Sequence, residues 1–556
     1  MAGRDPADVR VRGNNQSPVF IVCGRYHAVP LHDISILIIR SGEVLAMDIA
    51  HCLNEIETRV GRLSPMQKFL LGTDGSVTQI LEAITGKQVV IETRVQKIVP
   101  ADPAIAERLG IGSGDPVNYR VVEIKTLAGG DVLIYAISHT PLGRLSPEFK
   151  DDLMKADIPI GRIIQNHRIE ARREILDARV SPATDEAGRI FSIGRHEPLL
   201  SRQYRIIHNR EPLIFIEEQF PYNRFLDERR VVVQTPSRIH MTLIDMHGGS
   251  GRVDGGVGIT LDEPGILLEV SANPELEVNG CDSVTRERIM DTARTVLGGL
   301  RIGGSVSVTV RENVPSHIGL GSGSQVMLAT ARGIAEVYGR QVAVKDLAFL
   351  TGRGGTSGIG TAAFEHGGFI MDGGHAFGKD REKYGFRPSS ASVGVHPPPI
   401  IARHEFPSDW RVLLAIPRIP AGASGSKEKD IFRNHCPVPV DEVRELCHEI
   451  LMRLLPGIVE EDLDLFGSSV NAIQGLGFKK VELSLQPGEI QALLETVRSA
   501  GAAGAGMSSF GPTIYAIGDT DMQEIQRAAQ AFMDEHGGGS TLITRARNSG
   551  ALVRTA

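Results

Sequence analysis

Residues 314–325 read Val314-Pro315-Ser316-His317-Ile318-Gly319-Leu320-Gly321-Ser322-Gly323-Ser324-Gln325, and this glycine-rich stretch is the strongest indication of the fold in the sequence. The alternating residues Val306, Val308 and Val310 before it predict a strand, and apolar positions up to Val337 after it recur at helical spacing. A strand, a glycine-rich turn and a helix start together form a phosphate cradle. Glycines let backbone N–H groups approach phosphate oxygens, and the helix dipole favours negative charge. The alternative is an ordinary glycine turn with an N-cap serine.

The cradle is neither the Walker loop nor the dinucleotide-binding glycine pattern, since its glycines are spaced differently. Two hydroxyls, those of Ser322 and Ser324, can donate to the same anion as the backbone. The residues predicted to bind phosphate in this turn are Gly319, Gly321, Ser322, Gly323 and Ser324.

Composition excludes several classes of protein. The chain has 556 residues, too many for one ordinary core, and its net charge of −7 leaves no basic footprint for nucleic acid. Its five cysteines form no CxxC pair, which argues against a disulfide framework and a zinc site and fits a reducing cytoplasm. No apolar run approaches the ~20 residues of a membrane span, and the N-terminus lacks the apolar core of a secretory signal. We therefore expect a cytoplasmic protein with small-molecule substrates and no nucleic-acid or membrane partner.

The pattern of strands, helices and turns predicts two domains of α+β class. Residues 1–30 are expected to be a disordered tail, 31–223 a first domain, 224–230 a linker and 231–556 a second domain. The first domain has strand-like runs separated by turn signals, and Ser64-Pro65 begins a short helix. The strand-like runs are 89–95, 117–125, 132–138, 204–207 and 213–218. In the second domain the predicted elements include helices at 440–455 and 487–500 and a final strand at 540–544.

Three motifs of the second domain resemble those of the GHMP kinase superfamily, in the order found there. They are 236–245 (PSRIHMTLID), the P-x-x-x-G-L-G-S of 315–322, and 506–515 (GMSSFGPTIY). The resemblance implies a two-layer α+β fold. However, Gly360 stands where these kinases have an aspartate that activates the acceptor hydroxyl, and Gly323 stands where they have a second serine. Because glycine cannot accept a proton, a small-molecule kinase becomes the alternative interpretation.

A more specific resemblance covers residues 229–556. The stretches RIHMTLID, PSHIGLGSGSQ, GRGGTSGIG, FEHGGFIMDGG and GAGMSSFGPTIYAI are similar to those of β-ribofuranosylaminobenzene (or β-ribofuranosylphenol) 5′-phosphate synthases. This family implies that the ring carbon bearing the carboxylate of 4-hydroxybenzoate or 4-aminobenzoate attacks C1 of phosphoribosyl diphosphate. Diphosphate and carbon dioxide leave, in the methanopterin pathway. Backbone donors at 319–324, aided by Mg²⁺, would stabilise the leaving group.

The remaining candidate residues of this domain follow from their chemistry. Carboxylates at Asp245 and Glu365 are predicted to be catalytic, and Ser324 and Asp372 are predicted magnesium ligands. The predicted substrate-binding set also contains Arg238, His240, Arg353, Ser357, Ser509 and Gly511. The alternatives stay open: turn or surface carboxylates, a structural Arg238–His240 pair on one strand face, and a solvated loop arginine at Arg353.

The first domain is similar to the chorismate pyruvate-lyase family over about residues 60–222. The stretches that carry the resemblance are 63–71, 75–82, 158–162 and 212–221. It implies that Arg120 holds a carboxylate and that Glu217, four residues before Pro221, assists elimination of pyruvate, with Glu218 as the fallback. Taken by themselves, Arg120 and Glu217 could instead form a structural salt bridge or be charges of an edge strand.

The leading hypothesis is a bifunctional enzyme, because the lyase product, 4-hydroxybenzoate, is an acceptor for the synthase. That order favours 4-hydroxybenzoate over 4-aminobenzoate. A second hypothesis makes the first domain a ligand sensor, as in bacterial regulators, although no basic helix-turn-helix segment accompanies it. From the superfamily we expect a homodimer.

Overall fold

The computed structural model describes residues 48–127, 132–155, 158–226, 229–419 and 426–555. The predicted tail, the first part of the predicted first domain up to residue 47, the turn at 128–131 and residues 227–228 of the predicted linker lie outside the described residues. Within the described ranges, no helix is long and apolar enough to cross a membrane.

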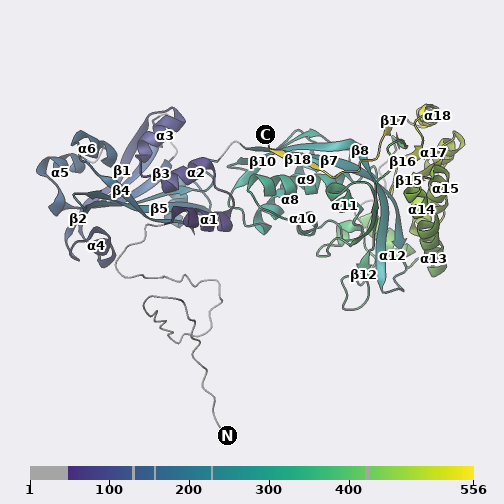
Figure 1. Cartoon of the computed structure of the whole chain (residues 1–556), viewed down its shortest axis with the longest axis horizontal. Coiled ribbons are helices and arrows are strands. Elements are labelled where there is room, and N and C mark those ends of the chain that lie inside the picture. The colour runs from purple at the N-terminus through teal and green to yellow at the C-terminus, as the bar shows by residue number, and fades with distance from the viewer. Residues whose placement is uncertain (1–47, 128–131, 156–157, 227–228, 420–425, 556) are drawn as a thin grey trace, which may run out of the picture. The chain divides into compact units, whose positions relative to one another are not determined.

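The first region is built on a six-stranded antiparallel sheet with strand order β1-β2-β3-β6-β5-β4 (Figure 1). Its strands are β1 (Val89–Pro100), β2 (Pro116–Thr126), β3 (Val132–Pro141), β4 (Arg172–Pro182), β5 (Pro198–His208) and β6 (Glu211–Pro221). The five runs read as strands in the sequence are confirmed, each within a longer strand. Strand β4 is not predicted by the sequence pattern, because its run RREILDARVSP is rich in charge and alternates only weakly between apolar and polar residues.

Short helices surround this sheet. They are α1 (Ile49–Val60), α2 (Pro65–Gly72), α3 (Val77–Thr85), α4 (Pro103–Leu109), α5 (Pro147–Met154), α6 (Ile160–Asn166) and α7 (Asp185–Phe191), with a 3₁₀ turn at Leu142–Arg144. Helix α2 begins as predicted at Pro65, where Ser64 and Gln67 form a reciprocal capping box that satisfies two backbone N–H groups.

The second region has a large sheet whose centre is the long strand β8 (Arg252–Asn273). The order β13-β11-β8-β10-β9 runs across it, and β7 pairs with both β8 and β18. The other strands are β7 (Arg230–Asp245), β9 (Glu277–Asn279), β10 (Ser305–Glu312), β11 (Phe369–Asp372), β12 (His375–Ala376), β13 (Ile400–His404) and β18 (Leu552–Thr555). The predicted strand around Val306–Val310 is therefore confirmed as β10, with its three valines buried.

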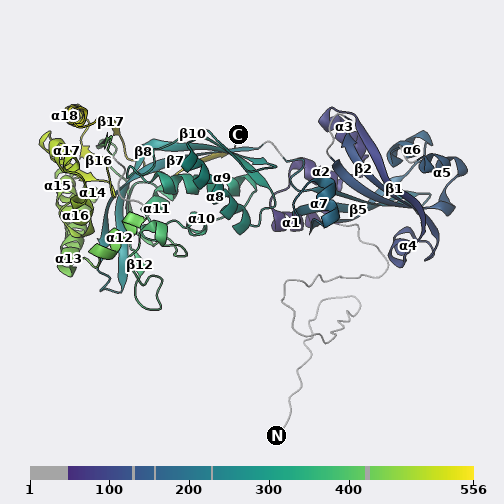
Figure 2. The same ribbon diagram turned by 180° about the vertical axis from the view of Figure 1, so that it is seen from behind.

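One face of this sheet is covered by helices, which gives two layers (Figures 1 and 2). The helices are α8 (Ser283–Gly299), α9 (Ser322–Val337), α10 (Val344–Leu350) and α11 (Ile359–Glu365). Helix α9 starts within the glycine-rich stretch, as predicted. Its buried face includes Val326, Ala329, Gly333 and Val337, which pack in the main core.

A second, four-stranded sheet of order β15-β16-β14-β17 completes the region. Its strands are β14 (Arg411–Pro417), β15 (Gly504–Met507), β16 (Ile514–Gly518) and β17 (Gly539–Thr544). Its helices are α12 (Ser426–His435), α13 (Val440–Glu449), α14 (Leu455–Val459), α15 (Leu463–Ile473), α16 (Gly477–Ser484), α17 (Gly488–Ser499) and α18 (Gln523–Glu535), with a π-helical turn at Ile450–Leu454 and a 3₁₀ turn at Ser389–Ala391. The helices predicted at 440–455 and 487–500 are confirmed, but the strand at 540–544 is not the final one, because β18 follows it.

Candidate active site

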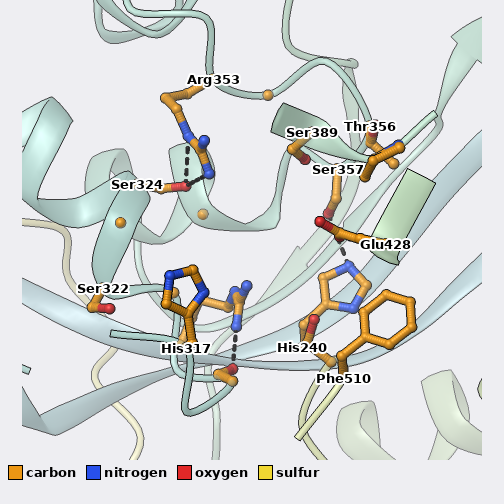
Figure 3. A pocket seen from close by; sticks show the side chains of 18 of the residues that line it. His240, His317, Ser322, Ser324, Arg353, Thr356, Ser357, Ser389, Glu428 and Phe510 are labelled. Carbon is orange, nitrogen blue, oxygen red and sulfur yellow. Dashed lines mark hydrogen bonds between the residues drawn. The ribbon is translucent and has the colours of Figure 1, made fainter. Parts of the chain in front are cut away.

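A cavity of about 300 Å³ opens where the glycine-rich turn meets the start of α9. All of the predicted substrate-binding residues line it, and Figure 3 shows His240, Ser322, Ser324, Arg353 and Ser357 around the same space. The predicted residues on its wall are Arg238, His240, Gly319, Gly321, Ser322, Gly323, Ser324, Arg353, Ser357, Ser509 and Gly511.

The glycine-rich turn forms the part of the wall that carries backbone donors. Gly319 and Gly321 have φ angles of 91° and 79°, the left-handed region that favours glycine, and α9 begins directly afterwards. Residues distant in sequence brace the turn: Ser508 Oγ donates to the Gly319 carbonyl (2.8 Å) and Thr513 Oγ1 donates to the Ile318 carbonyl (2.6 Å). The turn is thus held open toward the cavity, as an anion-binding loop requires.

Three arginines line the same end of the cavity. Arg353 donates to Ser324 Oγ, Arg238 donates to the Gly319 carbonyl, and Arg288 donates to Ser316 Oγ at 3.3 Å. Burial and the neighbouring Arg353 lower the pKa of Arg238 to about 10, and burial with Arg288 nearby lowers the pKa of Arg353. Crowded, buried cations of this kind are stabilised by a bound anion, so this end of the cavity suits phosphate groups.

The other end of the cavity is apolar. Leu243, Phe432 and Phe510 line it and belong to one hydrophobic cluster, with Pro388 beside them on the wall. Figure 3 shows Phe510 next to His240, away from the Ser322 and Arg353 side. A flat aromatic ring fits such a surface, and a ring bound there would lie next to whatever the arginines hold.

A chain of hydrogen bonds runs from the cavity wall into the protein. His240 Nε2 lies 3.0 Å from Ser357 Oγ, and Ser357 donates to Asp372 Oδ2 at 3.3 Å. Burial, with Arg238 and Lys479 nearby, holds the pKa of His240 well below its usual value, so its imidazole is neutral. Burial raises the pKa of Asp372 to about 7.

Two glutamates that were not predicted from the sequence also line the cavity. They are Glu428 on α12 and Glu482 on α16. Glu482 forms a buried ion pair with Lys479, whose ammonium also donates to the Met507 and Ser509 carbonyls. Among the described residues, Glu428 has no hydrogen bond or ion pair; burial, with repulsion from Glu482, raises its pKa to about 7. Both belong to amphipathic helices, and in the sequence they are indistinguishable from solvated helix carboxylates.

Three predicted carboxylates do not reach the cavity. Asp245 accepts from the His247 and Gly248 N–H groups and from Ser250, which closes a turn. Glu365 is partly exposed at the end of α11, beside His366. Asp372 is fully buried, and the Gly358 and Gly374 N–H groups occupy its oxygens. The structure therefore does not support the predicted catalytic positions of Asp245 and Glu365.

Protein contacts occupy both predicted magnesium ligands, Ser324 and Asp372. Asp372 is closed off from the cavity, and Ser324 Oγ already accepts two hydrogen bonds from Arg353. No cluster of three or more histidine, cysteine or carboxylate side chains is arranged for a metal in the described part of the chain. Mg²⁺ often binds through one protein carboxylate together with substrate phosphates, and Glu428 fits that requirement.

Gly360 lies on the cavity wall, beside Ser324. A Cβ atom built at this position would be 3.4 Å from Ser324 Cβ, an ordinary contact. The position is thus sterically open to a larger residue, and what it lacks is a carboxylate. A proton acceptor for the chemistry in this cavity must come from another residue.

The first region has its own, smaller cavity of about 70 Å³, lined by Arg120, Arg173, Tyr204 and Glu218. Arg120 lies there as predicted. Glu218 accepts from buried Arg202 (2.7 Å) and from Tyr204 (3.0 Å), whereas Glu217 is bonded to Gln203 and Gln219 on the other face of β6. The structure therefore places the fallback residue, Glu218, on the cavity wall and Glu217 on the opposite face, since neighbouring strand residues point to opposite faces.

Three family descriptions match parts of the chain. Residues 71–226 match Chorismate pyruvate-lyase Rv2949c-like, 287–368 match GHMP kinases N terminal domain, and 454–535 match GHMP kinases C terminal. These matches agree with the α+β architecture of both regions.

Curated relatives match the two regions separately. A β-ribofuranosylphenol 5′-phosphate synthase of Methanothermobacter thermautotrophicus is 45% identical over 330 residues, which cover 58% of this chain and 98% of that protein. A chorismate pyruvate-lyase of Mycobacterium leprae is 24% identical over 163 residues, 29% of this chain and 77% of that protein. Among solved structures, a homoserine kinase from Cytophaga hutchinsonii is 17% identical with a TM-score of 0.41, covering 59% of this chain and 98% of its own.

Proposed function

The chain belongs to the β-ribofuranosylphenol 5′-phosphate synthase family, with a chorismate pyruvate-lyase-like region preceding the synthase region, and from this premise we propose a bifunctional enzyme. The synthase region is an enzyme of the pentosyltransferase type. Its reaction joins 4-hydroxybenzoate, or 4-aminobenzoate, to phosphoribosyl diphosphate, with release of carbon dioxide and diphosphate. The first region supplies 4-hydroxybenzoate from chorismate and releases pyruvate.

One observation carries the synthase proposal: a single cavity has an anion-binding end and an aromatic end. The glycine-rich turn, Arg238, Arg288 and Arg353 bind the phosphate groups, and Phe432 and Phe510 hold the ring. In this arrangement the ribose C1 faces the ring carbon that bears the carboxylate. The geometry joins two bound reactants, which lowers the entropic part of the barrier.

The charges of the site fit the bond-breaking step. As the C1–diphosphate bond breaks, negative charge grows on the leaving group and positive charge on the ribose. The cradle donors at Gly319–Ser324 and the arginines stabilise the negative charge on the leaving diphosphate. The carboxylate of Glu428 is available to stabilise the positive charge on the ribose or to bind a cation. Bound Mg²⁺, held by Glu428 and the substrate phosphates, would neutralise charge on the departing diphosphate.

The lyase proposal rests on the small cavity of the first region. Arg120 binds a carboxylate of chorismate, and Glu218, fixed by Arg202 and Tyr204, faces the ring. This requires neither metal nor cofactor. A ligand-sensing role remains the alternative for this region, and turnover of chorismate distinguishes the two.

A kinase is the weaker candidate, because Gly360 supplies no carboxylate to an acceptor hydroxyl. We also propose a homodimer on the superfamily resemblance alone; light scattering of the purified chain measures it.

The experiment supplies the purified chain with chorismate labelled in its ring carboxyl group, phosphoribosyl diphosphate and Mg²⁺. The expected products are labelled carbon dioxide and a ribosylated phenol 5′-phosphate. Arg120→Ala should abolish product from chorismate and retain product from added 4-hydroxybenzoate. Arg353→Ala should instead accumulate 4-hydroxybenzoate. Absence of both products from the wild-type chain with either starting material contradicts the proposal.

A further inference from the structure

We propose that Ser357 takes the proton of the phenolic oxygen of the acceptor and passes its own proton to Asp372, a relay that a phenol needs and an aniline does not. This inference rests on the proposed synthase function and deepens it. It gives the synthase a proton acceptor at the site where Gly360 replaces the aspartate of the kinases.

The position of Ser357 is the first observation. Its side chain lies on the cavity wall, half-buried, between His240 Nε2 at 3.0 Å and Asp372 Oδ2 at 3.3 Å. Figure 3 shows Ser357 and His240 near Phe510, at the end of the cavity that suits a ring. The Ile359 N–H also lies 3.3 Å from Ser357 Oγ, and an incoming phenolic hydroxyl would compete with it for that lone pair.

His240 determines the direction in which the hydroxyl proton of Ser357 points. Ser508 accepts the His240 backbone N–H at 3.1 Å, and the Ser509 N–H donates to the His240 carbonyl at 2.8 Å, so the residue is pinned on both sides. Its ring is neutral because burial, Arg238 and Lys479 disfavour a charge. Because the single hydroxyl proton of Ser357 is directed at Asp372 Oδ2, His240 Nε2 must be the donor in its contact with Ser357 Oγ, which requires the Nε2–H tautomer.

Asp372 is suited to accept that proton. The Gly358 and Gly374 N–H groups hold its carboxylate at 2.9 and 3.0 Å, and burial raises its pKa to about 7. The charged and titratable groups around it are His240 through Ser357, His375, and Asp254, which is itself paired with Lys383. A carboxylate of this kind is ionised in part near neutral pH and gains a proton readily.

A glycine on β8 leaves room for the Ser357 and Asp372 side chains. A Cβ atom at Gly256 on β8 would be 2.8 Å from both Asp372 Oδ2 and Ser357 Oγ, closer than real side chains approach. A glycine at this point of a central strand is explained by the close approach of the two oxygens.

The chemistry balances without a further reactant. The phenolic O–H bond breaks, its proton goes to Ser357, and the Ser357 proton goes to Asp372. The oxygen lone pair forms a ring C=O while the carbon bearing the carboxylate bonds to the ribose C1, and the C1–diphosphate bond breaks with its electrons on diphosphate. The C–carboxylate bond then breaks, carbon dioxide leaves, the ring regains aromaticity, and the proton returns from Asp372 to the phenolic oxygen.

An aniline does not need this relay. The neutral nitrogen of 4-aminobenzoate can push its lone pair into the ring without losing a proton. Loss of the relay should therefore affect the two acceptors unequally, which a purely structural role of Asp372 would not do.

The test compares kcat of the full chain with 4-hydroxybenzoate and with 4-aminobenzoate, at saturating phosphoribosyl diphosphate, for wild type, Ser357→Ala and Asp372→Asn. We expect kcat to fall about 100-fold or more with the phenol, and less than about tenfold with the aniline. If Asp372→Asn does not fold, the Ser357→Ala variant alone tests the relay, because the Ser357→Ala substitution leaves the backbone contacts of Asp372 intact. Equal losses on both acceptors overturn the relay alone. A wild-type chain that uses neither acceptor overturns the synthase function and the relay together.

Discussion

The guanidinium of Arg353 donates two hydrogen bonds to the Ser324 hydroxyl, 3.0 Å from Nε and 2.8 Å from Nη2. The arginine belongs to the turn before α11 and the serine to the first turn of α9, so the pair joins the two elements that bound the phosphate end of the cavity. The planar guanidinium is thereby oriented before any substrate arrives, which reduces the ordering cost of binding.

Replacing Arg353 by lysine should weaken the binding of phosphoribosyl diphosphate. Lysine keeps the charge but cannot make the two-pronged contact with Ser324. Loss of a charged hydrogen bond of ~1.5–3 kcal/mol predicts a rise in KM of about 10- to 100-fold. Arg332→Lys is the matched control, since Arg332 lies on α9, the helix that carries Ser324, and pairs with Glu336 away from the cavity. Equal KM values for the two variants would refute the prediction.

Two glycines of the cradle should respond differently to alanine. Gly321 has a φ of 79°, and a Cβ there would approach the Arg238 side chain to 3.1 Å, so Gly321→Ala should lose roughly 1–3 kcal/mol and much of the phosphate affinity. Gly323 lies in the helix with its nearest contact, Arg288 Nη1, at 3.5 Å. Gly323→Ala should be as stable as wild type or more so. Thermal unfolding and calorimetric titration with phosphoribosyl diphosphate measure both effects.

In the first region, Glu218→Gln should abolish chorismate turnover and Glu217→Gln should not. Glu218 neutralises Arg202, whose side chain is 1% exposed, and breaking such a buried pair costs about 3–5 kcal/mol. Glu217 is partly exposed, and its substitution should change stability by ~0.5 kcal/mol or less. Pyruvate release measures chorismate turnover, and urea unfolding measures the stability of each variant. An inactive Glu217→Gln enzyme beside an active Glu218→Gln enzyme would reverse the assignment.

Glu428 should make the protein less stable as the pH rises. Burial and Glu482 raise its pKa to about 7 in the folded protein, partly offset by Arg353, against about 4.3 in an unfolded chain. The folded state therefore binds the proton more tightly, and the stability that this provides is present below about pH 4 and lost as the pH passes through 7. Glu428→Gln cannot ionise, so its melting temperature should fall less steeply between pH 4.5 and 7.5. Identical slopes for variant and wild type would contradict this.

The phosphate cradle could be predicted from sequence because it is local. Strand β10, the turn and α9 follow one another within about thirty residues, and the apolar spacing and glycines specify each. Arg238 and His240 could be predicted to lie on the same face of their strand, because alternate residues of a strand share a face.

Other parts of the site depend on tertiary contacts that leave no local pattern. Glu428 and Glu482 reach the cavity from α12 and α16, far along the chain, and their sequence neighbourhoods are those of ordinary surface helices. The choice between Glu217 and Glu218 also needed the structure, because β6 is apolar on both faces, with Phe215 and Ile216 both buried.

The brace of the glycine-rich turn has a consequence for dividing the protein. The turn lies in the segment that matches the N-terminal GHMP family, but its carbonyls at Ile318 and Gly319 are fixed by Thr513 and Ser508, which lie 195 and 189 residues later. The loop is therefore not a portable module: grafted alone onto another strand and helix, it would lose the contacts that fix its shape. Likewise, two fragments separated between α11 and α12 would each fail to bind phosphate and would regain phosphate binding only when they reassemble. Phosphate binding by this turn would therefore report on complementation between the two fragments.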